Sequence, residues 1–263
     1  MTSNFVAKDA DAYEKLMGRF SRQLAKGFMA FTGVASGERI IDVGCGTGSL
    51  SFALAAQGDH AEIIGIDVSA PYVEYAQSKN TFPRTRFEVA DATKLPFPAG
   101  VFDRAASQLV LMFLPDPSLA LMEMRRVVRP GGQIAACAWD LYGGMPHMRM
   151  LWDAASALGI VRDASLFRPL NTEGEMGAMW RQAGLIDVVE DTITTRFEFA
   201  DFDDYWTPFL SGDGPHGKMV VGLSEEQRAV LEKQVRHVFL SGRPDGRRSF
   251  IGAAWICKGQ VPG

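Results

Sequence analysis

The sequence has few cysteines, and none of them has the spacing of a zinc site or a disulfide framework. Cys45, Cys137 and Cys257 lie far apart, are odd in number and include no Cys-x-x-Cys pair. We therefore expect three reduced thiols in the core. No apolar run approaches membrane-spanning length, and the stretch MTSNFVAKDADAYEKLMGRF has no basic segment followed by an apolar one. These absences predict a cytoplasmic protein without membrane insertion.

An excess of positive charge is also missing. The 263 residues include 27 Lys and Arg against 31 Asp and Glu, for a formal net charge of −4. Such a chain presents no overall positive field to a phosphate backbone, so nucleic acid is not expected as a partner. Hydrophobic residues make up 47% of the chain. This share is enough to bury a sizeable core, in one domain with elaborations or in one domain plus a small subdomain.

Short β-branched or aromatic runs alternate with helical patterns as far as about residue 140. This alternation predicts βαβ units and a parallel sheet, and therefore an α/β fold. Asp116 and Pro117 are placed to cap and begin the last helix of the region. The expected strands are 39–43, 62–67, 86–90, 102–107 and 132–139, and the other expected helices are 49–57 and 70–79.

The pattern is less regular on either side of this region. An amphipathic helical segment over 8–32 precedes it. After residue 140 we expect a helix over 172–184, a strand over 187–199, a helical insert over 201–241 and a last strand over 248–258. The sheet would then have seven strands. The predicted division of the chain is an N-terminal helical cap (1–34), a ligand-binding core (35–140) and a segment of lid inserts and last strands (141–263).

Three glycines, Gly44, Gly46 and Gly48, follow the first strand and open a helix. A glycine-rich turn at such a junction lets a ligand approach the main chain, next to the free N–H groups of the helix N-terminus. Ser49 stands where a dinucleotide fingerprint would have its third glycine, and no Gly-Lys-Ser/Thr follows. A nucleotide-like ligand is predicted, although a tight turn with close helix packing is the alternative.

Two acidic residues end the next two strands. Asp67 lies 19 residues after Gly48 (67 − 48), where a carboxylate can accept both hydroxyls of a ribose. A helix cap is the alternative role for Asp67. Asp91 follows the third strand, where it can accept from an adenine amino group while the Ala92 N–H donates to a ring nitrogen. The pattern favours a ribose-bearing, adenine-containing ligand at the carboxyl ends of the strands.

In these residues the chain resembles the class I S-adenosylmethionine-dependent methyltransferases. The blocks IIDVGCGTG, GIDVS, ADATKLPFPAGVFDRAAS and RRVVRPGG occur in the family's order over residues 35 to 140. The likeness is greatest to the small-molecule branch that includes the ubiquinone and menaquinone biosynthetic methyltransferases. It implies a Rossmann-like, mostly parallel sheet flanked by helices, with a helical lid. Arg104 departs from the pattern in the fourth strand, and we interpret it as an edge or surface effect.

The resemblance also implies a site for S-adenosylmethionine and its product S-adenosylhomocysteine. Asp67 would hold the ribose, Asp91 would read the adenine edge, and Arg19 would pair with the cofactor carboxylate unless it is a solvated surface residue. Ser107 is an alternative to Gln108 beside the sulfonium. The expected cofactor contacts are Tyr13, Arg19, Gly44, Gly46, Thr47, Asp67, Val68, Asp91, Ala92 and Gln108.

Methyl transfer from a sulfonium is an in-line displacement that requires alignment, exclusion of water and, for some acceptors, a base. It needs no metal. Among the four histidines, His147 follows the fifth strand on the ligand side and is the candidate general base, ahead of His216. Tyr13, Phe20 and Trp139 are candidates for aromatic contacts with the sulfonium, with ordinary packing as the alternative.

The acceptor is expected to be a small, apolar or aromatic molecule, because the segments after residue 140 are rich in Met, Trp and Phe. Two other functions stay open. One is a methyltransferase of RNA or protein, which the acidity of the chain and the sequence SQLV after the fourth strand disfavour. The other is a non-catalytic S-adenosylmethionine-binding regulatory module. The chain is expected to act as a monomer or homodimer.

Overall fold

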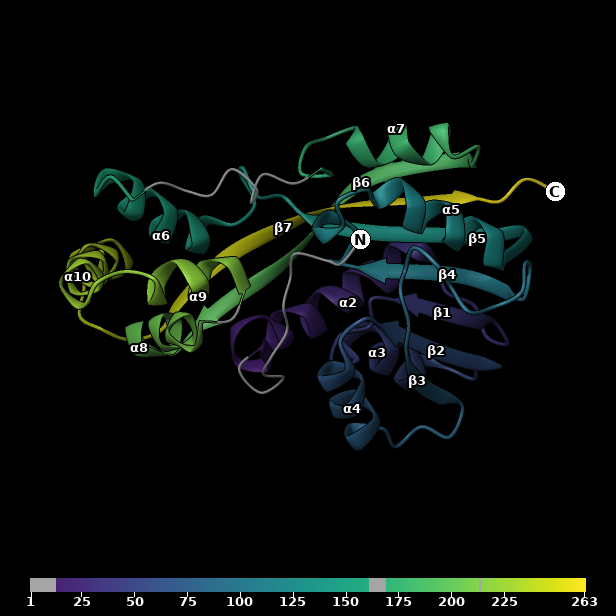
Figure 1. The fold of residues 1–263 in the computed structure, drawn as a ribbon, viewed down its shortest axis with the longest axis horizontal. Helices are drawn as coiled ribbons and strands as arrows, with labels where there is room; N and C mark the ends of the chain where they lie inside the picture. The colour runs from purple at the N-terminus through teal and green to yellow at the C-terminus, as the bar shows by residue number, and fades with distance from the viewer. Residues whose placement is uncertain (1–12, 161–168, 213) are drawn as a thin grey trace.

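A computed structural model of the chain describes residues 13–160, 169–212 and 214–263. Seven strands form one sheet in the order β3-β2-β1-β4-β5-β7-β6 (Figure 1). The predicted seven-stranded α/β fold is therefore confirmed. The strands are β1 (Arg39–Val43), β2 (Glu62–Asp67), β3 (Thr85–Val89), β4 (Phe102–Gln108), β5 (Val128–Trp139), β6 (Ile186–Phe199) and β7 (Arg248–Gln260).

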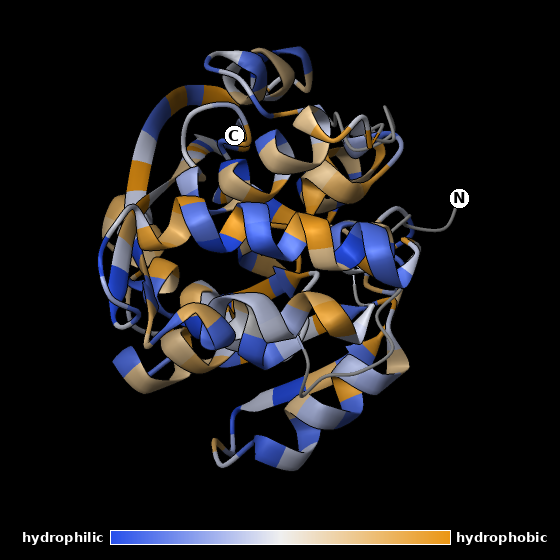
Figure 2. Cartoon of the chain, turned by 90° about the vertical axis from the view of Figure 1, so that its left-hand side faces the viewer, coloured by the Kyte–Doolittle hydropathy of each residue, from blue (hydrophilic) through white to orange (hydrophobic). Residues whose placement is uncertain are grey.

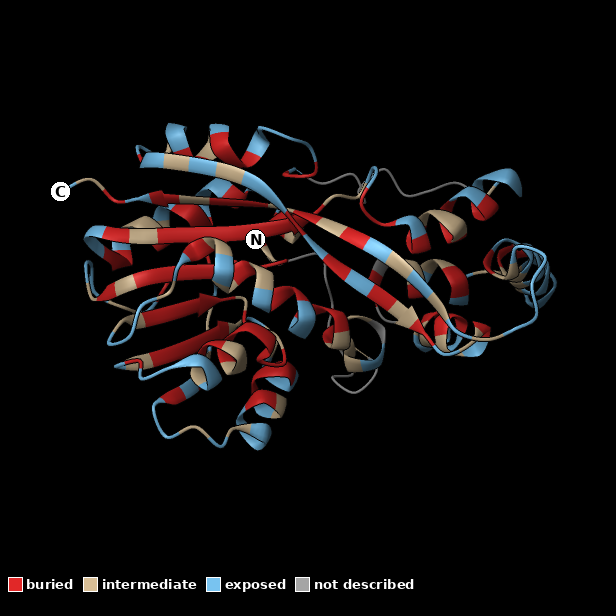
Figure 3. Cartoon of the chain, turned by 180° about the vertical axis from the view of Figure 1, so that it is seen from behind, coloured by how far each residue is buried: buried red, intermediate tan, exposed pale blue. Residues whose placement is uncertain are grey.

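Strands β1 to β5 are parallel to one another, and their carboxyl ends meet at one edge of the sheet. The runs RIIDV and EIIGID are buried on both faces, as expected for a sheet with helices on either side (Figure 3). β5 begins at Val128, directly after the helix α5 ends at Val127. The segment 129–132 therefore belongs to the strand, which starts four residues earlier than the sequence predicts (132 − 128).

β7 runs antiparallel to the rest of the sheet, and β6 beyond it runs in the same direction as β1 to β5. β7 pairs with β5 on one side and with β6 on the other. Both are long, and they continue past the carboxyl ends of the parallel strands (Figures 1 and 3). On β6 the second half alternates between buried and exposed residues, which gives this extension one packed and one solvated face.

Helices flank the sheet and cover the β6–β7 extension. Asp116 caps α5 by accepting from the Ser118 N–H, as predicted. The helices and helical turns are η1 (Glu14–Gly18), α2 (Arg19–Thr32), α3 (Ser49–Gln57), α4 (Ala70–Lys79), η2 (Leu111–Phe113), α5 (Pro117–Val127), α6 (Pro146–Ala157), α7 (Glu175–Gln182), α8 (Phe202–Trp206), η4 (Thr207–Ser211), α9 (Gly214–Val221) and α10 (Glu225–Leu240).

The segments expected to form a lid gather around the β6–β7 extension. α6 packs on β7 and on α10, while α8 packs on β6 and on α10. α10 begins with a capping box formed by Ser224 and Gln227. It buries Leu231, Val235 and Phe239, which are spaced four residues apart, and its exposed residues are mostly hydrophilic, although Val230 and Val238 are exposed as well (Figure 2). Phe167, expected in the lid, lies outside the described residues, as do residues 8–12 of the predicted N-terminal segment.

Arg104 is not a surface residue, which corrects the sequence interpretation. It is 4% exposed and forms an ion pair with Glu38, with Nε 2.7 Å from Oε2. Its guanidinium also donates to the carbonyl oxygens of Thr32 and Gly33 at the end of α2. A buried charge is tolerated when it is paired and hydrogen-bonded, so Arg104 joins β4 to the N-terminal helix.

The three cysteines are free and buried, as expected. No helix in the described ranges is both long and apolar enough to cross a membrane.

Candidate functional site

The glycine turn links β1 to α3 and has left-handed backbone at each of its glycines. Gly44, Gly46 and Gly48 have φ of +77°, +53° and +92°. A Cβ at Gly44 would collide with Val110, whereas one at Gly46 would approach nothing closer than Tyr72, at 4.0 Å. Gly44 is therefore required by packing, and Gly46 leaves open space above the main chain.

Asp67 connects the end of β2 to this turn. Its Oδ2 accepts from the Gly46 N–H at 2.9 Å, and its Oδ1 accepts from the Ser69 N–H at 2.8 Å. Burial raises the pKa of Asp67, although hydrogen bonds from the main chain act in the opposite direction. Each oxygen retains acceptor capacity. The carboxylate thus orders the turn and can still bind hydroxyl groups.

The end of β3 lies beside the end of β2. Val89 is the register partner of Asp67, so Asp91 and Ala92 follow at the same edge. Asp91 is exposed and accepts from the main-chain N–H and the hydroxyl of Thr93, each at 2.8 Å. Partial burial opposes ionisation, but these hydrogen bonds lower the pKa of Asp91. Val68, which directly follows Asp67 in the chain, is 53% exposed. Its side chain is available to an adenine ring.

Asp42 is a buried acid that the sequence analysis did not assign. It is 1% exposed and accepts from the Ser51 hydroxyl at 2.6 Å. Its Oδ1 has no partner among the described residues. Burial raises the pKa of Asp42 to about 7. The signal was present in the sequence, because one carboxylate interrupts the otherwise apolar strand IIDV.

The N-terminal segment lies over the glycine turn. The Glu14 carboxylate accepts from the Thr47 hydroxyl and pairs with Arg22. Tyr13 packs against Tyr72, with ring centroids 5.1 Å apart, and burial raises the pKa of Tyr13 to about 12. The structure therefore brings Tyr13 and Thr47 together at the turn. It adds Glu14, which the sequence analysis did not identify.

Arg19 forms its ion pair with the lid. Its Nη1 lies 3.0 Å from Oδ1 and 3.1 Å from Oδ2 of Asp204, on α8. Its guanidinium also lies 4.6 Å from the centroid of the Phe20 ring. Nε and Nη2 of Arg19 are buried and have no partner within the described chain. The side chain joins the N-terminal segment to the lid and keeps three N–H groups, one on Nε and two on Nη2, that a carboxylate can use.

The end of β4 holds two further candidates. Ser107 donates its hydroxyl hydrogen to the Val43 carbonyl at 2.8 Å, so it supports the end of β1. Gln108 donates from Nε2 to the Ser21 carbonyl at 2.9 Å, whereas its buried Oε1 has no partner in the described part of the chain. A buried acceptor without a donor indicates a missing ligand or water. Gln108 is thus the better candidate for a ligand contact.

His147 belongs to an aromatic layer between α2, β5, β6 and the lid. Its ring stacks on Phe197 at 3.8 Å, and Phe197 in turn contacts Phe20 and Trp139, at 4.5 Å and 5.3 Å. Desolvation lowers the pKa of His147 to about 3. The imidazole is therefore neutral and weakly basic at neutral pH. Its role as a general base stays a prediction.

Comparisons with known proteins agree with this geometry. Residues 41–136 match the family model described as a methyltransferase domain. The chain is 33% identical over 149 residues to demethylmenaquinone methyltransferase of Lysinibacillus sphaericus, covering 54% of this chain and 63% of that protein. It is 32% identical over 188 residues to O-methyltransferase rstn1 of Aspergillus nomiae, covering 69% and 77%.

A solved structure gives the same result for the fold. The YcgJ protein from Bacillus subtilis superposes with a TM-score of 0.58 and 21% identity, over 91% of this chain and 98% of that one. The chain therefore belongs to the class I S-adenosylmethionine-dependent methyltransferases, and its sheet is the Rossmann-like sheet of that family.

Proposed function

We propose that the chain transfers a methyl group from S-adenosylmethionine to a small, apolar or aromatic acceptor. The observation that carries this is the edge formed by the glycine turn, Asp67 and Asp91, which lies beside an aromatic layer. The relatives named demethylmenaquinone methyltransferase and O-methyltransferase support a small-molecule acceptor. The chain spans 63% of the first of these proteins.

The residues at this edge fit the cofactor. Gly46 leaves open space above the main chain, Asp67 retains acceptor capacity for a ribose, and Val68 is exposed beside it. Two buried oxygens, Oδ1 of Asp42 and Oε1 of Gln108, have no partner among the described residues. Nearly all buried polar atoms in proteins have a hydrogen-bond partner, so these two oxygens are candidates to bind a ligand or a water molecule. The arrangement suits a nucleoside with polar groups at both ends.

The bound cofactor supplies an electrophilic methyl group on a sulfonium, so the protein has to align the reactants and exclude water. Asp67 and Asp91 would fix the nucleoside, Tyr13 would close over the glycine turn, and Thr47 would contact the cofactor from within it. Arg19 would contact the cofactor carboxylate through the N–H groups that Asp204 leaves unused. His147 is the candidate base for the acceptor's proton, although its low pKa makes it a weak one.

The lid would select the acceptor. The side chains that α6 and α8 bury at the β6–β7 extension, and that η4 buries beside α8, are largely apolar, and a flat or lipophilic molecule would match them better than a polymer would. The ion pair between Arg19 and Asp204 would hold the lid to the N-terminal segment. We further propose that the chain works as a monomer or homodimer in the cytoplasm and does not act on nucleic acid.

The test has two steps. Calorimetry should detect binding of S-adenosylhomocysteine and no binding of NAD. A methyl-transfer screen over phenols, quinol precursors and small amines should then yield a methylated product. Binding of NAD without any response to S-adenosylhomocysteine would contradict the cofactor. Cofactor binding without transfer to any small acceptor, but with transfer to RNA or protein, would contradict the acceptor class.

A further inference from the structure

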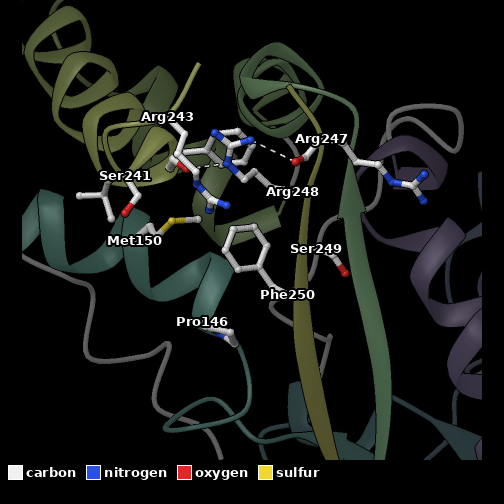
Figure 4. A pocket seen from close by; sticks show the side chains of 10 residues that line it. Pro146, Met150, Ser241, Arg243, Arg247, Arg248, Ser249 and Phe250 are labelled. Atoms are coloured by element: carbon white, nitrogen blue, oxygen red, sulfur yellow. Dashed lines mark hydrogen bonds between the residues drawn. The ribbon is translucent and has the colours of Figure 1, made fainter. Parts of the chain in front are cut away.

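A pocket of about 410 Å³ lies on the β6–β7 extension, between α6, the end of α10 and the start of β7 (Figure 4). Its volume falls within the range of small-molecule sites. None of its lining residues belongs to the proposed cofactor site. Its lining residues include Met150, Phe239, Ser241, Arg243, Arg248 and Phe250.

The floor of the pocket is apolar. Met150 comes from α6 and Phe250 from β7, and the Phe250 ring lies 6.2 Å from Phe239 on α10. Phe250 is only half-buried, so one side of its ring faces the pocket. An aromatic surface of this kind binds flat or aliphatic groups by removing them from water.

Arg248 forms part of the wall, and its guanidinium is held in place by the main chain. Each of its five N–H groups is directed at a main-chain carbonyl, at distances from 2.9 to 3.3 Å. The acceptors are the carbonyl oxygens of Phe239, Leu240, Pro244, Gly246 and Arg247. No carboxylate in the described chain pairs with Arg248. It therefore fixes the turn between α10 and β7 and leaves a positive charge without a counter-ion.

Arg243 lies on the turn that Arg248 fixes. It follows Ser241 and Gly242, which have φ of +48° and +74°. The Arg243 guanidinium makes no hydrogen bond or ion pair with the described residues, and it points over Met150 and Phe250 (Figure 4). The neighbouring Arg247 behaves differently, because it pairs with Glu198 at 2.9 Å and points away from the pocket.

The pocket therefore combines positively charged side chains with an apolar floor. No Asp or Glu is among its lining residues. Arg243 offers a planar, bidentate donor, and the Ser241 hydroxyl lines the same pocket. An anionic headgroup satisfies the donors, and an apolar body covers the rings.

We propose that this pocket binds a small amphiphilic anion, a phosphate monoester or carboxylate carried on a flat or short aliphatic body. Arg243 binds the anionic group, Arg248 positions the turn and adds charge, and Phe250 and Met150 contact the body. The site is separate from the cofactor edge. A soluble metabolite and a lipid headgroup share this chemistry.

The probe is 1-naphthyl phosphate, titrated by calorimetry into the full chain and into two variants. Arg243→Gln removes the charge while keeping a polar side chain, and it should weaken binding about tenfold, the effect of one charge-assisted hydrogen bond. Arg228→Gln is the matched control, because Arg228 lies near the start of α10 and does not line the pocket. It should leave binding unchanged. Both variants should bind S-adenosylhomocysteine like the parent chain.

Further ligands separate the parts of the proposal. Neutral 1-naphthol and inorganic phosphate should each bind more weakly than 1-naphthyl phosphate. Co-sedimentation with phosphatidylcholine vesicles, with and without phosphatidylglycerol, identifies the source of the anion. Sedimentation that depends on phosphatidylglycerol and is lost in Arg243→Gln would assign a lipid headgroup, and its absence would assign a soluble ligand. No binding of 1-naphthyl phosphate, or an equal affinity in Arg243→Gln, would overturn the proposal.

Discussion

The two halves of the sheet present different chemistry at the same edge. At β1, β2 and β3 the candidate contacts are main-chain N–H groups and carboxylates, with little bulk above Gly46. At β5, β6 and β7 they are rings, in a layer that runs from Phe20 through Phe197 and Phe199 to Phe250. Main-chain and carboxylate contacts suit one invariant cofactor, whereas aromatic packing adapts easily to different acceptors. Replacing a ring of the aromatic layer should therefore mainly lower stability, whereas replacing a carboxylate at the open edge of the first half should mainly lower cofactor affinity.

The largest effect is expected in the aromatic layer. Phe197 is fully buried and contacts rings on α2, β5 and α6. Phe197→Ala should lower the free energy of unfolding by about 3–5 kcal/mol, because it leaves a cavity that its neighbours cannot fill. Urea unfolding measures this. Ile251→Ala is the control, since Ile251 is 60% exposed on the adjacent strand. Equal, small losses in both variants would show that the layer does not stabilise this half.

A substitution in the first half of the sheet should lower the affinity for the cofactor. Asp67→Ala removes an acceptor for the ribose and also releases the Gly46 N–H. Affinity for S-adenosylhomocysteine should fall by about 2 kcal/mol or more, roughly thirtyfold, in calorimetry. Asp59→Ala is the matched control, because the Asp59 side chain is 85% exposed. Unchanged affinity in Asp67→Ala would move the ribose contact elsewhere.

The pH dependence of stability tests the buried acid Asp42, which lies on β1 in the first half of the sheet. Burial raises the pKa of Asp42 from 3.8 to about 7, so folding favours its protonated form. This contribution to stability is fully present below about pH 4 and is lost as the pH rises through 7. Between pH 5 and pH 8 the loss is on the order of 2 kcal/mol. Asp42→Asn should abolish that part of the pH dependence in urea unfolding. The same slope in both proteins would show that Asp42 does not titrate in this range.

Asp91 is exposed, so its replacement should cost less than that of Asp67. Asp91→Asn keeps the shape but removes a charged acceptor for the adenine amino group. The affinity for S-adenosylhomocysteine should fall about tenfold, or about 1.4 kcal/mol. A parallel titration with S-inosylhomocysteine, which lacks the amino group, should show little difference between Asp91→Asn and the parent chain. A similar loss for both ligands would mean that Asp91 acts through the loop and not through the base.

The smallest effect is expected at His147. A general base works best with a pKa near the operating pH, and burial lowers the pKa of His147 to about 3. His147→Gln should therefore slow transfer to the acceptor found in the screen by less than about tenfold. The pH profile of the rate should keep its shape. A loss of about a hundredfold, with a changed profile, would instead support the predicted role as base.

The sequence predicted most strand bounds to within two residues, and β5, which begins four residues earlier than expected, is the exception. The expected ranges 39–43, 62–67, 49–57 and 70–79 coincide with β1, β2, α3 and α4, because short-range patterns of burial, glycine and capping determine them. The positions of Asp67 and Asp91 at one edge follow from the parallel order of the strands. These contacts are local or set by the topology of the fold.

Contacts between distant segments were not predictable in the same way. Arg19 is paired with Asp204, 185 residues away, and the Glu14 carboxylate reaches Thr47. The partner of Arg104, Glu38, lies on another segment as well. An arginine can be solvated or can pair with a carboxylate far away in the chain. The residues next to it in the sequence do not distinguish these two cases. The pocket at Arg243 has the same origin, because α6, α10 and β7 meet only in the folded chain.

The position of β7 has a consequence for the order of folding during synthesis. β7 lies between β5 and β6, although it is made after both, and its residues pair with β5 across a gap of more than 100 residues, as in Trp139 with Ala254. β6 cannot join the sheet until residues 248–260 have left the ribosome. The parallel strands β1 to β5 can assemble earlier, but the edge of β5 then stays open. This nascent state, with an unpaired central strand, is the one in which the chain most needs protection from aggregation.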